Sequence, residues 1–303
     1  MAASGFEQEF AQHGVQWQHI VGDVQRLDRA LARWHVSGSS FLTSGRDISR
    51  AEFDDFRDFY VLRALTLLWH PDKDVMRVVP ISLWVDDGRV ISYAAEPVEA
   101  FSQARKRLSD NPDWVVSPTR LVYYLLDELM TALFPFLDGL NERIARLEDE
   151  VFRSSRPGRV ERRIFRLKRE ALRARRALAS MRDAIAQLVR HWTTRSPHDP
   201  FYYMELYDHM IRHFDTVDTY RELVNSVLDL HLSNVNNRLN EIVKALTLVT
   251  TVLLPASLMA GLYGMNFDYI PLKHNHYGFF VVIAIICAIS LAVYWIFRRR
   301  KWL

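Results

Sequence analysis

Cysteine is almost absent from this sequence, and long parts of the C-terminal region lack charged residues altogether. The one cysteine, Cys287, lies inside such an uncharged stretch. A single thiol excludes an intrachain disulfide and a cysteine-based zinc cluster, and its apolar setting does not favour a nucleophilic role. The N-terminal residues, MAASGFEQEF, lack the basic start and apolar core of a cleaved signal peptide, so we expect none.

Charged residues are missing from residues 245–267 and again from residues 278–297. Each stretch reaches the roughly 20 residues that a helix needs to cross the hydrocarbon core of a bilayer. The whole chain is 49% hydrophobic and 25% charged, as in an ordinary soluble protein, so its apolar residues are concentrated near the C-terminus. We therefore predict two transmembrane helices, joined by a short extracytoplasmic loop at residues 268–277.

A basic cluster, Arg298-Arg299-Arg300-Lys301, directly follows the second apolar stretch. Lysine and arginine next to a membrane span hold that end of the helix in the cytoplasm. We therefore predict a cytoplasmic tail at residues 298–303. Two spans return the chain to its starting side, so the N-terminus is also expected in the cytoplasm. The predicted location is the cytoplasmic (inner) membrane, as a multi-pass protein.

Strand signals are confined to the first hundred residues, where they alternate with helix signals. The segments rich in β-branched and aromatic residues are DFYVLRALTLLW (58–69), VMRVVPISLWV (75–85) and RVISYAA (89–95). Asp86-Asp87-Gly88 between the last two predicts a hairpin. An amphipathic helix is predicted at residues 96–108, with a proline near its start. We predict an α+β domain over residues 1–116.

Only helix signals follow residue 116. Ser117-Pro118 is typical of an N-cap followed by proline at the first helical position, and predicts a helix to about Arg153, with a kink at Pro135. An arginine-rich second helix is predicted at about residues 160–194. Together these segments form a predicted helical hairpin over residues 117–199.

The segment from residue 201 to 262 contains one proline, Pro255, and one glycine, Gly261. It predicts a continuous helix of about 60 residues, about 90 Å long at 1.5 Å per residue. Its first part, residues 200–244, is a cytoplasmic stalk, and residues 245–267 form the first transmembrane helix. A helix of this length needs partners packed along it, because propensity alone does not stabilise it.

A heptad-spaced series of mostly polar or small residues runs along this helix, and we call it the inner stripe. Asparagine and aspartate would weaken a dry two-stranded coiled coil, but they suit helices that stand apart around water. The stripe therefore predicts the lining of a pore made by several copies of the chain; the alternative is a helix that tolerates a few polar residues. The inner stripe consists of Asp229, Asn236, Asn240, Val243, Thr250, Leu254, Ser257 and Gly261.

The end of the first span carries the sequence YGMNF (263–267), preceded by NEIVKALTLVTTVLLPASLMAGL (240–262). With the second span and the ending RRRKWL, these segments resemble the CorA family of divalent-cation channels over residues 117–303. The resemblance implies a homopentamer shaped like a funnel, in which five long helices surround the axis and the second spans form an outer ring. It also implies influx of Mg²⁺, and of Co²⁺, gated by intracellular Mg²⁺.

The same resemblance implies that Gly264, Met265 and Asn266 form the selectivity filter. Mg²⁺ sheds its water reluctantly, so neutral oxygens that bind its hydration shell suit it. A ring of Asn266 amides would supply them, with Gly264 allowing a tight backbone and Met265 and Tyr263 packing around it. The alternative is an ordinary helix C-cap built from glycine and asparagine.

Further rings are expected deeper in the pore. Ser257, Thr250 and Asn240 would offer oxygen atoms, whereas Leu254 and Val243 would narrow the bore with apolar rings that close by dewetting. Simple packing is the alternative for each of these residues. Asp229 would attract cations in a cytoplasmic vestibule, or would lie on a solvated helix face.

Family members also carry regulatory carboxylates, and matching back from the GMN motif places Asp127 and Glu205 at those positions. Structural salt bridges are the alternative role for both residues. The partner acids of the N-terminal region are not identified, because the segment FLTSGRD (41–47) is poor in acids.

The predicted outer loop departs from the family pattern, with Ile270-Pro271-Leu272-Lys273 where many magnesium-selective members carry Met-Pro-Glu-Leu. His274 and His276 follow, and imidazoles suit Zn²⁺, Ni²⁺ or Co²⁺. A proton-coupled Zn²⁺ or Ni²⁺ transporter of the ZntB type is therefore the alternative within the family. His209 and His213, four residues apart, would form a second metal site or a solvated helix face.

Two hypotheses outside the family compete with transport. The basic helix at residues 159–182 suggests a membrane-anchored protein that binds nucleic acid or lipid, but it lacks stacking aromatics, so no nucleic-acid partner is expected. An anchored enzyme is not favoured, because no P-loop, nucleophile elbow or Cys-His site occurs. The predicted partners are copies of the same chain, the lipid bilayer and divalent cations.

Overall fold

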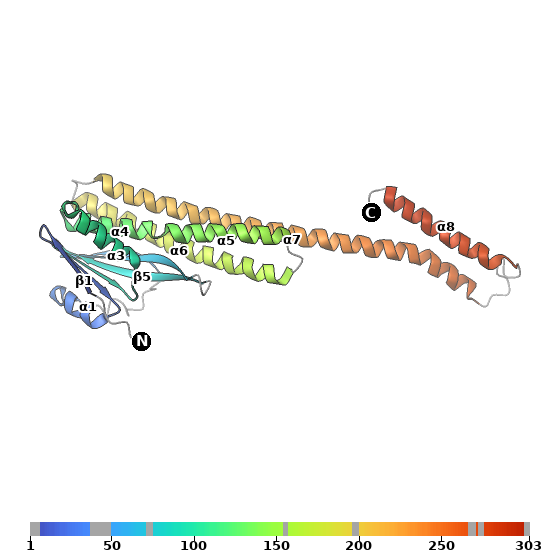
Figure 1. Cartoon of the computed structure of the whole chain (residues 1–303), viewed down its shortest axis with the longest axis horizontal. Helices are drawn as coiled ribbons and strands as arrows, with labels where there is room; N and C mark the ends of the chain where they lie inside the picture. Colours follow the sequence, from blue (N-terminus) through green and yellow to red (C-terminus); the bar gives the residue numbers. More distant parts are fainter. Residues whose placement is uncertain are drawn as a thin grey trace. The chain divides into compact units, whose positions relative to one another are not determined.

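The computed structural model describes residues 7–36, 50–70, 75–153, 157–195, 200–265, 271 and 276–299. The chain divides into two compact units, Met1–Leu228 and Asp229–Leu303. Elements keep the labels of Figure 1, which is coloured along the sequence.

The first unit is built on a mixed six-stranded sheet (Figure 1). Its spatial order is β1-β2-β6-β5-β4-β3, and all neighbouring strands are antiparallel except β2 and β6. The prediction of an α+β fold is confirmed, although the sequence analysis identified only the three later strands. The strands are β1 (Glu7–Gln12), β2 (Val15–Val21), β3 (Glu52–Asp55), β4 (Tyr60–His70), β5 (Val75–Val85) and β6 (Arg89–Ala94).

The predicted hairpin between β5 and β6 is present and is closed by Asp86. Its carboxylate Oδ1 accepts hydrogen bonds from the backbone N–H groups of Gly88 at 2.9 Å and Arg89 at 2.6 Å. The backbone N–H of Asp86 also donates to the carbonyl of Arg89 at 3.0 Å. An aspartate at the start of a turn stabilises it by such side-chain bonds, which fixes the register of the two strands.

Both faces of the sheet are covered by helices, as the alternation of buried side chains in β2 requires. Ile20 faces α1 (Val24–Leu31), where it joins an apolar cluster with Leu27 and Leu31. Trp17 and His19 point to the opposite face, toward α3 (Glu99–Asp110), where the His19 ring lies 4.4 Å from the ring of Phe101. Short 3₁₀ helices follow α1 at Ala32–Trp34 and α3 at Pro112–Trp114.

The predicted helical hairpin contains three helices, α4 (Pro118–Thr131), α5 (Phe134–Arg153) and α6 (Pro157–Arg195). Ser117 caps α4 as predicted, since its hydroxyl accepts a bond from the N–H of Arg120 at 3.2 Å. The expected kink at Pro135 is instead a break between α4 and α5, and Pro135 lies in the first turn of α5. Proline fits there because the first turn needs no intrahelical N–H donor.

Helix α6 packs against both the sheet and the start of α7 (Pro200–Tyr263). The indole N–H of Trp192 donates to the Tyr60 hydroxyl on β4 at 3.0 Å, and its ring lies 4.9 Å from the ring of Tyr203 on α7. Along the same helices, the Arg175 guanidinium lies 2.6 Å from the Asp218 carboxylate. These contacts join the sheet, α6 and the first part of α7 into one core.

The second unit contains the remainder of α7 and helix α8 (Gly278–Arg299). In the described part of the chain, α7 and α8 are the two helices long and apolar enough to cross a membrane. Helix α7 ends at Tyr263, before the predicted end of the first span at residue 267. Residues 266 and 267 lie outside the described residues.

Candidate functional site

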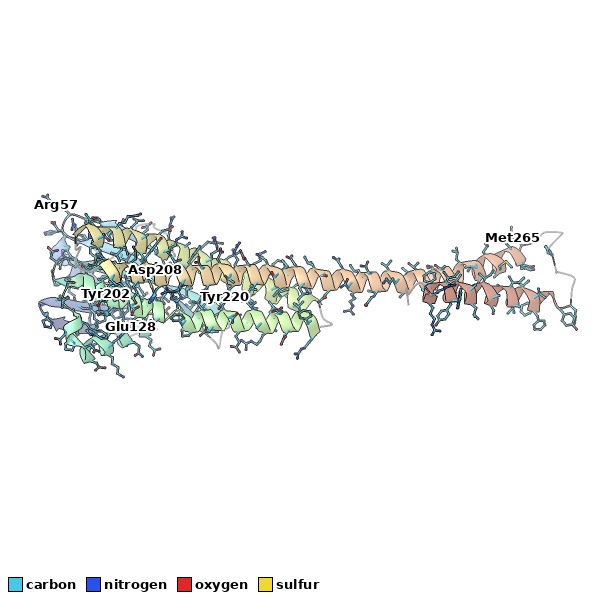
Figure 2. All side chains as sticks on the ribbon, turned by 90° about the horizontal axis from the view of Figure 1, so that it is seen from above. Arg57, Glu128, Tyr202, Asp208, Tyr220 and Met265 are labelled. Atoms are coloured by element: carbon cyan, nitrogen blue, oxygen red, sulfur yellow. The ribbon has the colours of Figure 1, made fainter. Side chains whose placement is uncertain are left out.

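The inner stripe occupies one side of the second half of α7. At 3.6 residues per turn, its eight positions fall within an arc of about 100° on a straight helix. All eight side chains are exposed in the single chain. Figure 2 shows side chains projecting from several sides of this part of α7. A stripe that lines a pore would have to occupy one side of its helix in this way.

Apolar residues are exposed together with the polar ones. Leu254 of the stripe is 72% exposed, and Leu246, Leu253 and Leu258 are exposed elsewhere on the helix. A soluble protein rarely leaves a contiguous apolar surface of this kind uncovered. This part of α7 therefore needs lipid or other protein chains around it.

The threonines of α7 direct their hydroxyl hydrogens back into the helix. The Thr250 Oγ1 donates to the carbonyl of Leu246 at 2.9 Å or of Thr247 at 3.0 Å. Thr247 donates in the same way to the carbonyl of Val243 at 2.8 Å. A hydroxyl used as a donor keeps its lone pairs for acceptance, so Thr250 can present an acceptor oxygen to the hydrogen atoms of a metal-bound water.

Helix α7 ends in a compact turn at Gly264. The Gly264 N–H donates to the carbonyl of Ala260 at 3.0 Å, and the Met265 N–H donates to that of Leu262 at 3.4 Å. A Cβ atom on Gly264 would lie 3.2 Å from the Ala260 oxygen, a tighter approach than ordinary contacts allow. A side chain at position 264 would therefore require the helix end to shift by a few tenths of an ångström.

The C-cap alternative needs a left-handed glycine after the helix. Among the described residues, positive φ angles occur at His13, Gly14, Gly22 and His35, and Gly264 is not one of them. The turn at the end of α7 is therefore not a left-handed cap. Met265 follows it (Figure 2), while Asn266 lies outside the described residues.

The first unit brings the two predicted regulatory carboxylates close together. The Tyr123 hydroxyl on α4 donates to the Glu205 carboxylate on α7 at 3.0 Å. One turn further along each helix, the Asp127 carboxylate lies 3.6 Å from His209 Nδ1. Matching by sequence placed these acids on separate helices, and the fold makes them neighbours.

Asp127 lies in a strongly charged setting. Burial raises the pKa of its carboxyl group, and the positive charges of Arg107 and His209 oppose that rise. The Arg107 guanidinium lies 3.4 Å from Asp127 and 2.7 Å from Glu128. Burial, followed by the charge of Asp127 and the bond to Glu205, also raises the pKa of the Tyr123 hydroxyl. Asp127 and Glu128 therefore share one cationic partner, Arg107.

This group, which we call the acidic cluster, consists of Asp127, Glu128 and Glu205 with Arg107, Tyr123 and His209. Within the described part of one chain, no three His, Cys, Asp or Glu side chains are placed to hold a metal ion. A cation bound at the acidic cluster would need further oxygen ligands from outside the described part of this chain. In the structure, the Arg107 guanidinium pairs with Asp127 and Glu128. Arg107 and Tyr123 were not predicted as part of this site, although the four-residue spacing of Tyr123 and Asp127 on one helix offered a signal for Tyr123.

The two histidines of α7 do not form the solvated face considered above. His209 contacts Asp127, whereas His213 is buried and its ring lies 4.9 Å from the ring of Phe134. Burial lowers the pKa of His213. The two rings therefore have different partners, and the expectation of a solvated pair is wrong. His276 packs edge-on to Tyr277 at 5.6 Å, and His274 lies outside the described residues.

Comparison with known proteins identifies the family of this chain. The family model described as CorA-like Mg2+ transporter protein matches residues 13–299. The Cobalt/magnesium transport protein CorA of Thermotoga maritima is 30% identical over 260 residues, which cover 84% of this chain and 72% of that protein. The Zinc transport protein ZntB of Photorhabdus laumondii is 23% identical over 232 residues, covering 75% and 69%.

The fold matches over almost the full length. The complete structure of the CorA magnesium transporter from Methanocaldococcus jannaschii superimposes with a TM-score of 0.82. The match covers 97% of this chain and 93% of that one, at 24% sequence identity. The order of sheet, helices and two apolar C-terminal helices is therefore shared with that structure.

Proposed function

This chain belongs to the CorA-like Mg2+ transporter family and is a divalent-cation transporter, and from that premise we propose that it carries Mg²⁺ into the cytoplasm. Co²⁺ is proposed as a second substrate, since the Thermotoga maritima relative is named for both ions. Five copies of the chain would surround one pore in the inner membrane, with both termini in the cytoplasm. An enzymatic activity is not proposed, because the relatives are transporters.

The observation that carries this proposal is the inner stripe at the end of α7. Its described polar members are neutral within the span, and Thr250 presents an acceptor oxygen. Mg²⁺ binds its water molecules tightly, so a pore that receives the hydrated ion avoids the cost of dehydration. A ring of Asn266 amides at the mouth, set by the turn at Gly264, would receive the ion's water shell.

Substitution of Asn266 by alanine tests the filter directly. We expect the Asn266→Ala variant to lose Mg²⁺ uptake into proteoliposomes by at least tenfold, because the amide oxygens are removed while the helices remain. Asn237→Ala is the matched control, since Asn237 lies on α7 outside the inner stripe and is exposed. Both variants should elute from a sizing column as the wild type does. Normal uptake by Asn266→Ala would refute the filter.

Regulation by internal Mg²⁺ is proposed for the acidic cluster. Bound Mg²⁺ would compete with Arg107 for Asp127 and Glu128, and a neighbouring copy would supply the missing oxygens. The rise in the pKa of Asp127 supports this, because a divalent cation stabilises the ionised form that burial disfavours. Closure of the pore would then follow from high internal Mg²⁺.

A ZntB-type transporter is the second candidate, supported by the ZntB relative and by the histidines of the predicted outer loop. Flux of Mg²⁺, Co²⁺, Ni²⁺ and Zn²⁺ into liposomes, with and without a proton gradient, separates the two. Mg²⁺ uptake without a gradient is the expected result. Zn²⁺ uptake that requires protons, with no Mg²⁺ uptake, would replace the first candidate by the second.

A further inference from the structure

A pocket rich in arginine lies between α5 and α6 in the first unit, and the transport function does not account for it. Its volume is about 480 Å³, within the range of small-molecule sites. None of the seven described residues that form its wall is acidic. They are Trp69, Arg143, Arg146, Leu147, Arg163, Arg166 and Leu167.

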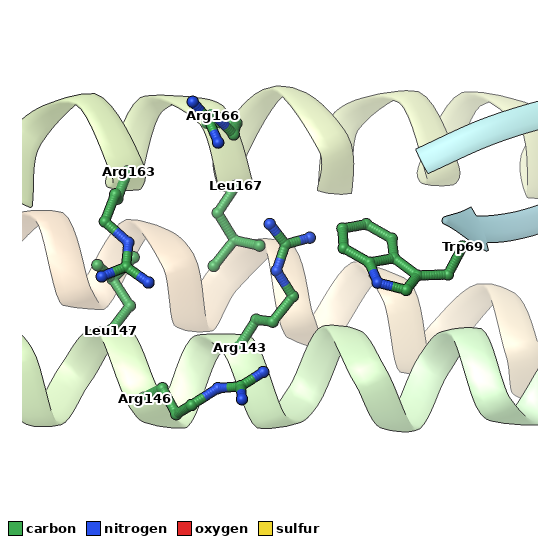
Figure 3. Close-up of a pocket in the computed structure, with 7 residues that line it drawn as sticks. All are labelled: Trp69, Arg143, Arg146, Leu147, Arg163, Arg166 and Leu167. Carbon is green, nitrogen blue, oxygen red and sulfur yellow. The ribbon is translucent and has the colours of Figure 1, made fainter. Parts of the chain in front are cut away.

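The two helices contribute two arginines each, one pair from α5 and one from α6. Figure 3 shows Arg143 extending from α5 toward α6 and Arg163 extending from α6 toward α5, with Leu167 between them. Arg146 and Arg166 flank this space on the two helices. Four positive groups are thus placed around one small volume, where their charges repel one another unless carboxylates or other anions offset them.

Arg143 is held in a fixed orientation. Its guanidinium carbon lies 4.0 Å from the centroid of the Trp69 ring, and its Nη1 donates to the Glu170 carboxylate at 2.8 Å. Glu170 is buried, so this pair is shielded from solvent. Stacking and a buried partner orient the planar group, which reduces the entropy lost when its remaining N–H groups bind a ligand.

Two other arginines of the pocket form ion pairs in which the arginine side chain is largely exposed. The Arg146–Glu142 pair is separated by 3.5 Å, with side chains 62% and 68% exposed. Arg163 lies 2.5 Å from Glu150 and its side chain is 58% exposed. Exposed ion pairs contribute little free energy. Each guanidinium also has five N–H donors, more than one carboxylate uses.

The surrounding helix adds to the positive potential. Between residues 157 and 195, α6 carries twelve lysine and arginine residues but three aspartate and glutamate residues. A hollow surrounded by charge of one sign concentrates the field and attracts counter-ions. The guanidinium fork also matches the geometry of phosphate oxygens, which accept two parallel hydrogen bonds.

From these observations we propose that the arginine pocket binds a multivalent phosphate anion, such as pyrophosphate or the polyphosphate of a nucleotide. The ligand would contact arginines of both helices and so tie α5 to α6. A small pocket of this size accommodates such an anion, whereas a nucleic-acid duplex requires an extended surface. The proposal does not depend on which cation the protein transports.

Binding to the full-length protein in detergent tests the proposal. Pyrophosphate is titrated by calorimetry in buffer with EDTA, so that divalent cations do not sequester it. Arg146→Gln/Arg163→Gln removes two exposed pocket charges and leaves the Arg143–Glu170 pair intact. Arg153→Gln/Arg176→Gln is the matched control, since these exposed arginines lie one on each helix and outside the pocket wall. ATP and dihexanoyl phosphatidic acid are titrated in parallel to identify the source of the phosphate.

We expect at least one of the three ligands to bind the wild type and the control equally, and the pocket variant at least tenfold more weakly. Hydrogen exchange of α5 and α6 should slow when that ligand is added to the wild type, and should not slow in the pocket variant. Equal binding to all three proteins would show a non-specific charge effect and overturn the proposal. Absence of binding by every phosphate ligand would overturn it as well.

Discussion

His19 shows how a single buried polar residue links the stability of the first unit to pH. Its side chain is 3% exposed, and its Nδ1 lies 2.8 Å from the Ser92 hydroxyl. The Ser92 oxygen also accepts a bond from the Trp17 indole at 2.9 Å. The Ser92 oxygen has two lone pairs and can accept from both Trp17 and His19, so the direction of the bond with His19 follows the tautomer of the imidazole.

Burial lowers the pKa of His19 from 6.5 to about 4. As the pH falls below 6.5, the unfolded chain therefore binds a proton before the folded chain does, and stability decreases until the pH reaches about 4. We expect the free energy of unfolding to drop by about 3 kcal/mol across this window on account of His19 alone. Thermal unfolding of the purified protein at a series of pH values, followed by tryptophan fluorescence, measures this loss.

Two variants separate His19 from other titrating groups. His19→Gln remains neutral, so its unfolding temperature should change less between pH 7 and pH 5 than that of the wild type. His213 is also buried and its pKa is also lowered, so the unfolding temperature of this variant will still depend on pH to some extent. His13→Gln is the control because His13 is exposed, and it should retain the full pH dependence. If the unfolding temperature of His19→Gln depended on pH as strongly as that of the wild type, this account would be contradicted.

At the scale of elements, α6 is the helix that joins the sheet to α7. Trp192 is 1% exposed and donates to the Tyr60 hydroxyl on β4 at 3.0 Å. Burial raises the pKa of Tyr60, so this hydroxyl stays protonated at neutral pH. Trp192 therefore has two roles: its N–H hydrogen-bonds the buried Tyr60 hydroxyl, and its ring packs against Tyr203 of α7.

Replacing Trp192 by phenylalanine removes the indole N–H and part of the packed volume. We expect the free energy of unfolding to fall by about 2–4 kcal/mol, since a buried hydroxyl loses its partner and a small cavity is left. Thr194→Val is the control on the same helix, because Thr194 is exposed and its hydroxyl donates to the carbonyl of Arg190 in its own helix. That variant should change stability by less than about 0.5 kcal/mol. Denaturant unfolding compares the two, and equal stabilities would refute this role for Trp192.

At the scale of the whole molecule, exposure of the inner stripe points to assembly. A lone chain would present Asp229 and the polar residues of α7 on one side of the same helix that exposes leucines elsewhere. Several copies around an axis resolve this conflict, because polar residues then face water and apolar residues face neighbours or lipid. Native mass spectrometry should give an assembly of about five times the 35.5 kDa chain.

Cysteine cross-linking tests which side of α7 faces the axis. In a Cys287→Ser background, we expect Leu254→Cys to form disulfide-linked dimers on oxidation, since identical residues face one another around the pore. Leu253→Cys is the control, because it is also exposed but lies outside the inner stripe. Cross-linking at 253 and not at 254 would show that the stripe faces away from the axis. A monomeric or dimeric particle would refute the assembly itself.

Local sequence signals determined much of this architecture. The uncharged stretches predicted two helices that are long and apolar enough to cross a membrane, Ser117 predicted the start of α4, and Asp86-Asp87-Gly88 predicted the β5–β6 hairpin. Each of these depends on interactions within a few residues, so a short segment contains the information. The break at Pro135 was placed correctly but interpreted as a kink, because sequence does not show whether a helix resumes in a new direction.

Only the tertiary structure decided which distant side chains meet. Arg107 lies on α3 and Glu205 on α7, whereas Asp127 lies on α4, and no local pattern predicts that these three residues lie close together. The same is true of Trp69 and Arg143 in the arginine pocket, and of His213, whose ring contacts Phe134 of α5. These contacts are set by how the elements pack, since packing joins residues far apart in the chain, whereas periodicity and capping report only on near neighbours.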